Sequence, residues 1–237
     1  MAEILDFKLR IIYEDNHLLV VEKLPGILVQ GDSTKRTTLI EVAKRYIKEK
    51  YKKPGNVFLG IVHRLDRVTS GIVVFARTSK SAKRLSESFR ERKIEKIYLA
   101  ICEGNIAKEE GKLRNWLSWD ENKHKTQIFD NLVPQSKEAL TYYKVLNRFK
   151  NLSLVLLLPQ TGRKHQLRVQ LSHIGHPILG DKKYNAKRKF IKDYIALHCF
   201  KLKLEHPIKK EIMEFKINPP SFWNNLFPMI HEIVEKI

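Results

Sequence analysis

Apolar and polar residues alternate in short runs along most of the chain, a pattern typical of half-buried β-strands. Ile97, Leu99 and Ile101 recur at every second position and predict one such strand. Residues 105–137 are rich in Lys and Asn and predict turns with at most one hairpin. Further strands are predicted within 10–29, at 58–63 and 70–77, in a pair at 138–146 and 151–159, and in a long hairpin at 194–217.

Apolar residues at helical spacing predict helices at 38–53, 79–93, 162–175 and 222–237, the last capped by Ser221. Thr38 and Glu41 form a capping box at the start of the first. Gly175 ends the third, and Pro177 blocks its continuation. Because strands outnumber helices and join through short turns, the predicted class is α+β with a mixed, mostly antiparallel sheet.

Length and charge narrow the class of protein. At 237 residues the chain forms one domain or two closely packed subdomains. Its net charge of +19 favours a polyanionic partner, nucleic acid before an anionic membrane, over a merely solubilising surface. No apolar run approaches the ~18 residues of a membrane span. Residues 1–12 lack the apolar core of a signal peptide, so a cytoplasmic location is expected.

Motifs for cofactors are missing from the sequence. It contains no GxxxxGK[ST] or GxGxxG, no HExxH, and no Cys/His cluster with the spacing of metal ligands. Cys102 and Cys199 are the two cysteines, and they form no CxxC. We therefore expect a protein that needs neither cofactor nor metal. A monomer is expected as well.

One charged segment interrupts the strand pattern in GIVHRLDRVTSGIVVFART, residues 60–78. A single carboxylate, Asp66, stands there beside Arg64 and Arg67, between two apolar runs. A surface turn between two such strands usually carries Gly, Pro or Asn. Asp66 is therefore either a turn residue paired with an arginine or a reactive group, and spacing alone favours the turn residue.

A second charged segment is TGRKHQLRVQLSHIGHPILGDKKY, residues 161–184. The predicted helix carries Arg163, Lys164, His165 and Arg168, and free amides at a helix start together with arginines suit a phosphate. A solvated basic face is the alternative. The cations that follow predict the rim of an RNA-binding surface: Lys182, Lys183, Lys187, Arg188, Lys189 and Lys192.

Four motifs, in order along the chain, resemble those of the RluA-type RNA pseudouridine synthases. HRLDRVTSG (63–71) is similar to their HRLD-x-x-TSG signature, and KIYLAICEG (96–104) to their K-x-Y-x-A strand. TGRKHQLRVQLSHIGHPILGD (161–181) is similar to their TGR-x-HQ-[IL]-R helix with its His-Pro-x-x-GD exit, and LHCFKLKLEHP (197–207) to a late LHA…L…HP element. The resemblance implies one catalytic domain over 1–237 that converts uridine in RNA to pseudouridine. The implied fold is a bent sheet flanked by helices, with an active-site cleft across its middle.

The resemblance also implies roles for single residues. Asp66 is the nucleophile, Arg168 keeps it charged and oriented, and Tyr98 stacks on the base and takes part in removing the carbon 5 proton. Arg64 fills the space left when the target nucleotide flips out of its stack. Further substrate contacts are expected from His63, Arg163, His165 and Leu197.

The chain departs from the family pattern at Val68, Lys164 and Gln170, where aspartate, threonine and histidine are common. These changes are expected to alter RNA contacts. The small N-terminal RNA-binding domain of many relatives is not expected, so the basic surface itself must hold the rRNA or tRNA substrate.

Three other functions remain open from the residues. A catalytically silent RNA-binding protein would explain the charge but not a lone carboxylate among core strands. A nucleoside hydrolase or glycosylase would also use a carboxylate, but would release free base. A DNA-binding regulator would carry a helix-turn-helix or zinc finger, and neither stands out.

Overall fold

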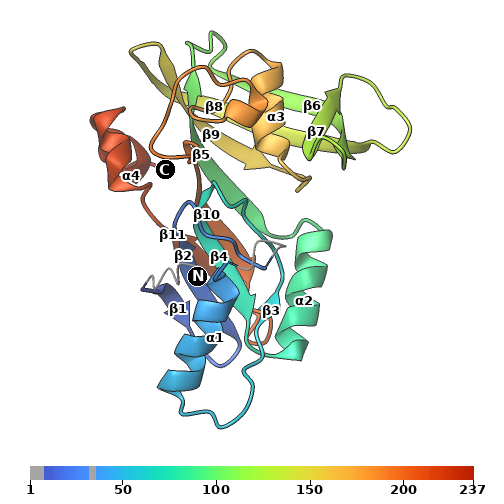
Figure 1. Cartoon of the computed structure of the whole chain (residues 1–237), viewed down its shortest axis with the longest axis vertical. Helices are drawn as coiled ribbons and strands as arrows, with labels where there is room; N and C mark the ends of the chain where they lie inside the picture. Colours follow the sequence, from blue (N-terminus) through green and yellow to red (C-terminus); the bar gives the residue numbers. More distant parts are fainter. Residues whose placement is uncertain (1–7, 32–35) are drawn as a thin grey trace. The chain divides into compact units, whose positions relative to one another are not determined.

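The computed structural model describes residues 8–31 and 36–237. Residues 1–12 were expected to lack a signal peptide, and residues 1–7 of that stretch lie outside the described residues. The described chain has a mixed α+β fold with a large, mostly antiparallel open sheet of eleven strands, which confirms the predicted class (Figure 1). It divides into two compact units, Met1–Ile94 with Lys201–Ile217, and Glu95–Phe200 with Asn218–Ile237. Strand β10 (Leu197–Glu205) contributes residues to both. None of the described helices is long and apolar enough to cross a membrane.

The first unit is built on strands that are buried on both faces. Residues 18–21 and 72–76 are all 0% exposed, because β2 and β4 pair antiparallel in its interior. Strands of this kind need near-continuous apolar runs rather than alternation. The elements of this unit are β1 (Arg10–Glu14), β2 (Leu18–Lys23), α1 (Leu39–Lys50), β3 (Gly60–Ile61), β4 (Ser70–Ala76), α2 (Ser79–Arg90) and β11 (Ile212–Lys216).

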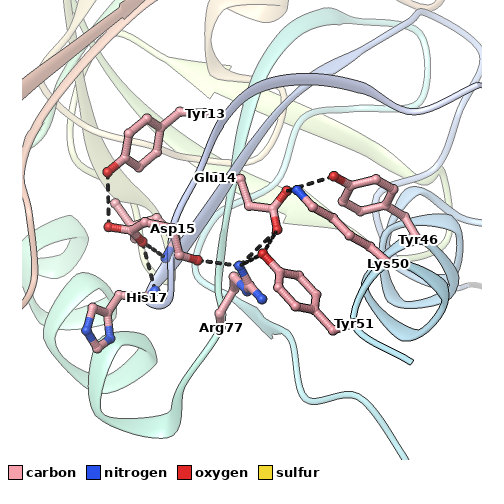
Figure 2. A network of polar contacts seen from close by, with 9 residues as sticks. Tyr13, Glu14, Asp15, His17, Tyr46, Lys50, Tyr51 and Arg77 are labelled. Atoms are coloured by element: carbon pink, nitrogen blue, oxygen red, sulfur yellow. Dashed lines mark hydrogen bonds and ion pairs between the residues drawn. The ribbon is translucent and has the colours of Figure 1, made fainter. Parts of the chain in front are cut away.

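Two adjacent carboxylates fix the end of β1 in this unit (Figure 2). Asp15 accepts hydrogen bonds from the amides of His17 and Leu18 at 2.8 Å each, which closes the predicted turn before β2. Glu14 accepts from four side chains: Tyr46 at 2.8 Å, Lys50 at 2.7 Å, Tyr51 at 2.6 Å and Arg77 at 3.0 Å. The contacts join β1 to α1 and to Arg77, which directly follows β4.

The second unit is a sheet in the order β5-β9-β8-β6-β7, with α3 packed against β6 and β7 (Figure 1). Every pairing within this order is antiparallel. Its elements are β5 (Glu95–Glu103), β6 (Glu110–Asp120), β7 (Lys125–Phe129), β8 (Lys137–Phe149), β9 (Leu152–Pro159), α3 (Gln166–His173), η1 (Lys182–Tyr184), η2 (Ser221–Asn225) and α4 (Ile230–Glu235).

Residues 105–137 contain the hairpin that the sequence allowed, but more of this stretch is strand than the expectation of turns implied. Residues 110–120 form the 11-residue strand β6, which pairs with β7 as a hairpin and with β8 on its other side. The buried face of β6 includes Asn115, a polar residue that hides the alternation in the sequence. Asn115 is tolerated there because its amide donates to Asp130 at 3.2 Å and its carbonyl oxygen accepts from Gln170 at 3.3 Å.

All four predicted helices are shorter than expected, and the last and the third differ most. The last is divided into η2 and α4, because Pro228 disfavours a helical conformation at the residue before it and has no amide to donate. The third begins at Gln166, where His165 is the N-cap with a left-handed φ of 56°. It ends as predicted, with Gly175 at a φ of +84°.

Candidate active site

The predicted catalytic and RNA-contacting residues fall into two groups, one in each unit. In the first unit, Arg64 and Asp66 lie in the irregular segment between β3 and β4. The Thr69 amide donates to the Asp66 carbonyl at 3.0 Å, which makes residues 66–69 a tight turn. Leu65 is buried, Asp66 is half-buried and Arg64 is exposed. The side chain of Leu65 therefore anchors the segment, while its two charged neighbours remain within reach of solvent.

His63 fixes the start of this segment to the scaffold. Its Nε2 accepts a hydrogen bond from the Val74 amide at 2.9 Å, and its ring stacks on Phe89 with centroids 4.7 Å apart. An acceptor role for Nε2 requires the neutral ring with its proton on Nδ1. His63 thus has a structural role in addition to the RNA contact expected from the sequence.

A buried lysine, which the sequence did not reveal, holds the end of this segment that follows Asp66. Lys23, at the end of β2, is 0% exposed, and its Nζ donates to the carbonyls of Leu24 at 3.1 Å, Arg67 at 3.1 Å and Thr69 at 2.5 Å. Three ammonium protons therefore meet three carbonyl oxygens, two of them in the Asp66 turn. The Gly26 amide donates to the same Arg67 carbonyl at 2.7 Å. These bonds fix the backbone that follows Asp66.

Burial lowers the pKa of Lys23 from 10.5 to about 7; the negative charge of Asp66 opposes this shift and the charge of Arg67 adds to it. The Asp66 carboxylate is therefore close enough to stabilise the buried ammonium. The signal in the sequence was a lysine at the end of the apolar run LLVVEK, followed by a Pro-Gly turn. A charged residue in such a place is rarely buried without a partner.

In the second unit, Arg168 lies on α3 and is ion-paired with Asp181. Arg168 Nε lies 2.6 Å from Asp181 Oδ2, and its Nη2 lies 2.8 Å from Oδ1. The two side chains are only 7% and 1% exposed. The charge of Arg168 is thus compensated inside its own unit.

The ring of Tyr184 lies beneath this pair, with the guanidinium carbon of Arg168 5.1 Å from its centroid. The Tyr184 hydroxyl accepts from the Thr126 amide at 2.9 Å and lies 2.8 Å from His165 Nδ1. Burial raises the pKa of Tyr184, so its hydroxyl stays protonated at neutral pH. The predicted RNA-contacting residue His165 is therefore part of the support beneath Arg168.

The start of α3 is held mainly by its own side chains. Gln166 Oε1 accepts from the Arg163 amide at 3.0 Å and from the Thr161 hydroxyl at 2.7 Å. Arg163 Nε donates to the Glu138 carbonyl at 3.0 Å. The ammonium of Lys164, which is exposed, lies over the ring of Trp119. The helix start that was expected to bind a phosphate is therefore held firmly, and its amides of Arg163 and Gln166 are already bonded.

The other predicted pocket residues of this unit lie on strands. Tyr98 is half-buried on β5, paired with Leu157 of β9, and Leu197 is buried at the start of β10. Gln170 is 1% exposed and accepts from the Thr141 hydroxyl at 2.7 Å. Gln170 therefore joins α3 to the sheet, and its expected effect on RNA contacts would be indirect.

The basic rim is exposed but anchored. Glu103 accepts from the amides of Lys187 at 3.0 Å and Arg188 at 2.7 Å, so the backbone is held while the side chains face solvent. Lys183 Nζ donates to the His124 carbonyl at 2.9 Å. A groove of about 590 Å³ lies between β7 and α3, with Lys123, Lys125 and His173 in its lining. Across the described residues, no group of three or more His, Cys, Asp or Glu is arranged to hold a metal ion.

Comparison with known proteins decides the family. A family model for RNA pseudouridylate synthase matches residues 17–173. The chain belongs to the RNA pseudouridine synthase family. It is 39% identical over 210 residues to the dual-specificity RNA pseudouridine synthase RluA of Haemophilus influenzae, covering 87% of this chain and 91% of that protein. It is 34% identical over 229 residues to the ribosomal large subunit pseudouridine synthase D of Borreliella burgdorferi, covering 92% and 68%.

A solved structure agrees with the sequence relatives. Human RNA pseudouridylate synthase domain containing 4 matches with a TM-score of 0.75 and 27% identity, over 90% of each chain. The predicted family, fold class and reaction class are thereby confirmed. The chain is an RNA pseudouridine synthase, which is an isomerase, and its substrate is RNA.

The first prediction tests the buried position of Lys23. Unfolded, this lysine has its ordinary pKa of 10.5, whereas folded it has a pKa of about 7. Between these values the unfolded state holds one more proton, so the free energy of unfolding should rise with pH by roughly 1.4 kcal/mol per unit. Below pH 7 the lysine is protonated in both states, and this contribution to the slope vanishes. Lys23→Met should lack the added slope.

The measurement is denaturant unfolding from pH 6 to pH 10 in the wild-type protein and the variant. Lys44→Met, which removes an exposed lysine of α1, is the matched control. Equal slopes in wild type and Lys23→Met between pH 7.5 and 10 would show that Lys23 is not a buried, titrating ammonium.

Proposed function

We propose that the chain isomerises specific uridines in structured rRNA or tRNA, with Asp66 as the nucleophile. One observation carries this role. The turn around Asp66 is held by two carbonyl bonds of Lys23, and His63 anchors the segment that leads into it, yet the Asp66 carboxylate is only half-buried. A reactive group needs this combination of a rigid backbone and an accessible side chain.

The chemistry needs no external reagent. The bond between ribose carbon 1′ and uracil N1 breaks, a bond between carbon 1′ and uracil carbon 5 forms, carbon 5 loses a proton and N1 gains one. Atoms and electrons balance within the substrate. An aspartate, with a reference pKa near 3.9, supplies an ionised nucleophile at neutral pH for attack on sugar or base.

Arg168 and Tyr98 act in the same reaction under this proposal. Because Asp181 compensates its charge, Arg168 contributes as an oriented hydrogen-bond donor more than as a net cation. Tyr98 stacks on the base, and its place in the middle of β5 holds the ring steady. Leu197 contributes apolar wall, and Arg163 and His165 contribute contacts from the start of α3.

The relatives support the choice of RNA. The Haemophilus protein is described as dual-specificity and the Borreliella protein as acting on the large ribosomal subunit. We therefore keep both rRNA and tRNA as substrates of the proposal, with a cytoplasmic monomer as the working form. The exposed, anchored rim provides the contact with phosphates.

The central prediction concerns Asp66→Asn, which preserves shape and removes charge. Pseudouridine formation should fall below detection because an amide is a poor nucleophile, while folding and RNA affinity remain. Glu91→Gln, which alters a surface carboxylate paired with Lys93 at 2.7 Å, is the matched control and should keep normal activity. Tritium release from 5-tritiated uridine in total RNA measures the reaction.

Near-normal activity in folded Asp66→Asn would refute the nucleophile role and leave Asp66 a turn residue, whose ion pair is worth at most about 1 kcal/mol. Free uracil released by the wild-type protein would instead support a base-releasing hydrolase. Wild-type protein that binds RNA without either product would be a silent binder.

Arg64 provides a test of base flipping. It is exposed at the edge of the Asp66 turn, where an arginine can fill the space of an extruded base. Arg64→Ala should slow single-turnover rates on a base-paired target by about tenfold, or 1.4 kcal/mol, and affect a target uridine that is already unpaired much less. Arg90→Ala on α2 is the exposed control. Equal losses on both substrates would contradict a flipping role.

The rim predicts a change in salt dependence. Each lysine or arginine that contacts phosphate adds roughly 0.7–0.9 to the slope of log affinity against log salt. Reversing Lys187, Arg188 and Lys189 to Glu should therefore lower that slope by about 2–3. The control reverses Lys44, Lys48 and Lys53, which changes net charge equally in the other unit. Equal slopes in the rim variant and the control would place the rim away from RNA.

A further inference from the structure

The buried ion pair between Arg168 and Asp181 is more than a surface contact. Asp181 receives both Nε and Nη2 of the guanidinium, at 2.6 and 2.8 Å, in the parallel two-bond geometry that defines orientation as well as distance. Both side chains are at least nine-tenths buried. Removing one partner of such a pair leaves an uncompensated buried charge, so each residue constrains the other strongly.

Asp181 is itself fixed by the backbone around it. Its amide donates to the Ile178 carbonyl at 2.9 Å, and its carbonyl accepts from the amides of Tyr184 at 2.9 Å and Ala186 at 3.1 Å. This compact turn leads into η1. The carboxylate therefore projects from a rigid frame, not from a mobile loop.

A second support lies under the guanidinium. The Tyr184 ring faces Arg168, and its hydroxyl joins β7 through the Thr126 amide and the start of α3 through His165. Arg168 is thus held along one edge by a carboxylate and on one face by an aromatic ring. Any further acceptor must be reached through Nη1 or through the second proton of Nη2.

We propose that Asp181 is a positioning residue that directs the Nη1 side of Arg168 toward the reacting groups. The inference rests on the proposed role of Arg168, and it assigns a role to the Asp of the GD sequence, for which the motif resemblance gave none. Asp181 touches no substrate in this scheme. A misplacement of about 1 Å in a catalytic group costs on the order of 100-fold in rate, which sets the expected effect.

The purely structural alternative makes different predictions. If Asp181 only neutralises a buried charge, its loss should lower stability, and folded protein should react at a normal rate. If it positions Arg168, the rate of bound substrate should fall while RNA affinity is kept. The loss of rate caused by changing Asp181 should also disappear when the residue at 168 can no longer make the two-bond contact.

The experiment is a double-mutant cycle with Asp181→Asn and Arg168→Lys, measured as single-turnover rates at saturating enzyme and followed for hours so that slow variants are quantified. Melting temperature and RNA Kd are recorded for each variant, and rates are taken well below melting. Glu109→Gln, which removes the charge from the exposed pair with Arg148, is the matched control in the same unit. Asp181→Glu keeps the charge but shifts the carboxylate, and it replaces Asp181→Asn in the cycle if that variant does not fold.

We expect Asp181→Asn to lose about 100-fold in rate with Kd within about twofold of wild type, and Asp181→Glu to lose less. In the Arg168→Lys background the same change should alter the rate less than threefold, because the two residues act as one unit. A folded Asp181 variant with a normal rate, additive losses in the cycle, or a loss confined to Kd would each overturn the inference. Asp66→Asn distinguishes a failure of the proposed function from a failure of the positioning role. An active Asp66→Asn variant refutes the proposed function. An inactive Asp66→Asn variant, together with an Asp181 variant of normal rate, refutes only the positioning role.

Discussion

Taking a cation out of water is unfavourable unless every N–H group finds an acceptor, and each unit of this protein contains one such cation. In the first unit, the ammonium of Lys23 donates to three carbonyl groups, two of them in the turn that carries Asp66. In the second unit, the guanidinium of Arg168 pairs with Asp181. Satisfying these donors dictates where the surrounding backbone must lie. The shape of the charged segments follows from that requirement more than from local turn preferences.

Much of the scaffold was predictable from the sequence because its signals are local. The apolar runs of β2 and β4, the capping box of Thr38 and Glu41, and the Gly175 stop each act within a few residues. The length of β6 was underestimated because Asn115 occupies a buried position and only a distant partner, Gln170, makes this favourable. The last helix was overestimated because the effect of Pro228 was not weighed. These errors arise where a residue depends on a partner far along the chain or on an unfavourable backbone.

In the candidate site, too, local signals could be predicted from the sequence and distant partners could not. Asp66, Tyr98 and Arg168 could be named because the motif resemblance carried them, and the motifs are contiguous in sequence. The bond from Lys23 to Thr69 spans 46 positions, and no periodicity indicates it. Asp181 lay within a matched motif, yet its pairing with Arg168 depends on how α3 folds back toward the turn before η1. Residues proposed to touch substrate were therefore easier to predict than the residues that hold them.

The exposed charges of this protein are suited to binding RNA, whereas its buried charges are suited to holding the candidate reactive groups in place. The chain carries a net charge of +19, but the buried cations Lys23 and Arg168 are matched inside their own units, so the long-range attraction for RNA comes from exposed cations, which under the proposed function include those of the rim. Exposed charges are screened over about 8 Å at physiological salt, whereas buried pairs are screened much less. Salt can thus weaken RNA capture and leave the hydrogen bonds around Asp66 and Arg168 in place. An enzyme with this arrangement can release a large polyanionic product without disturbing the geometry of its reactive groups.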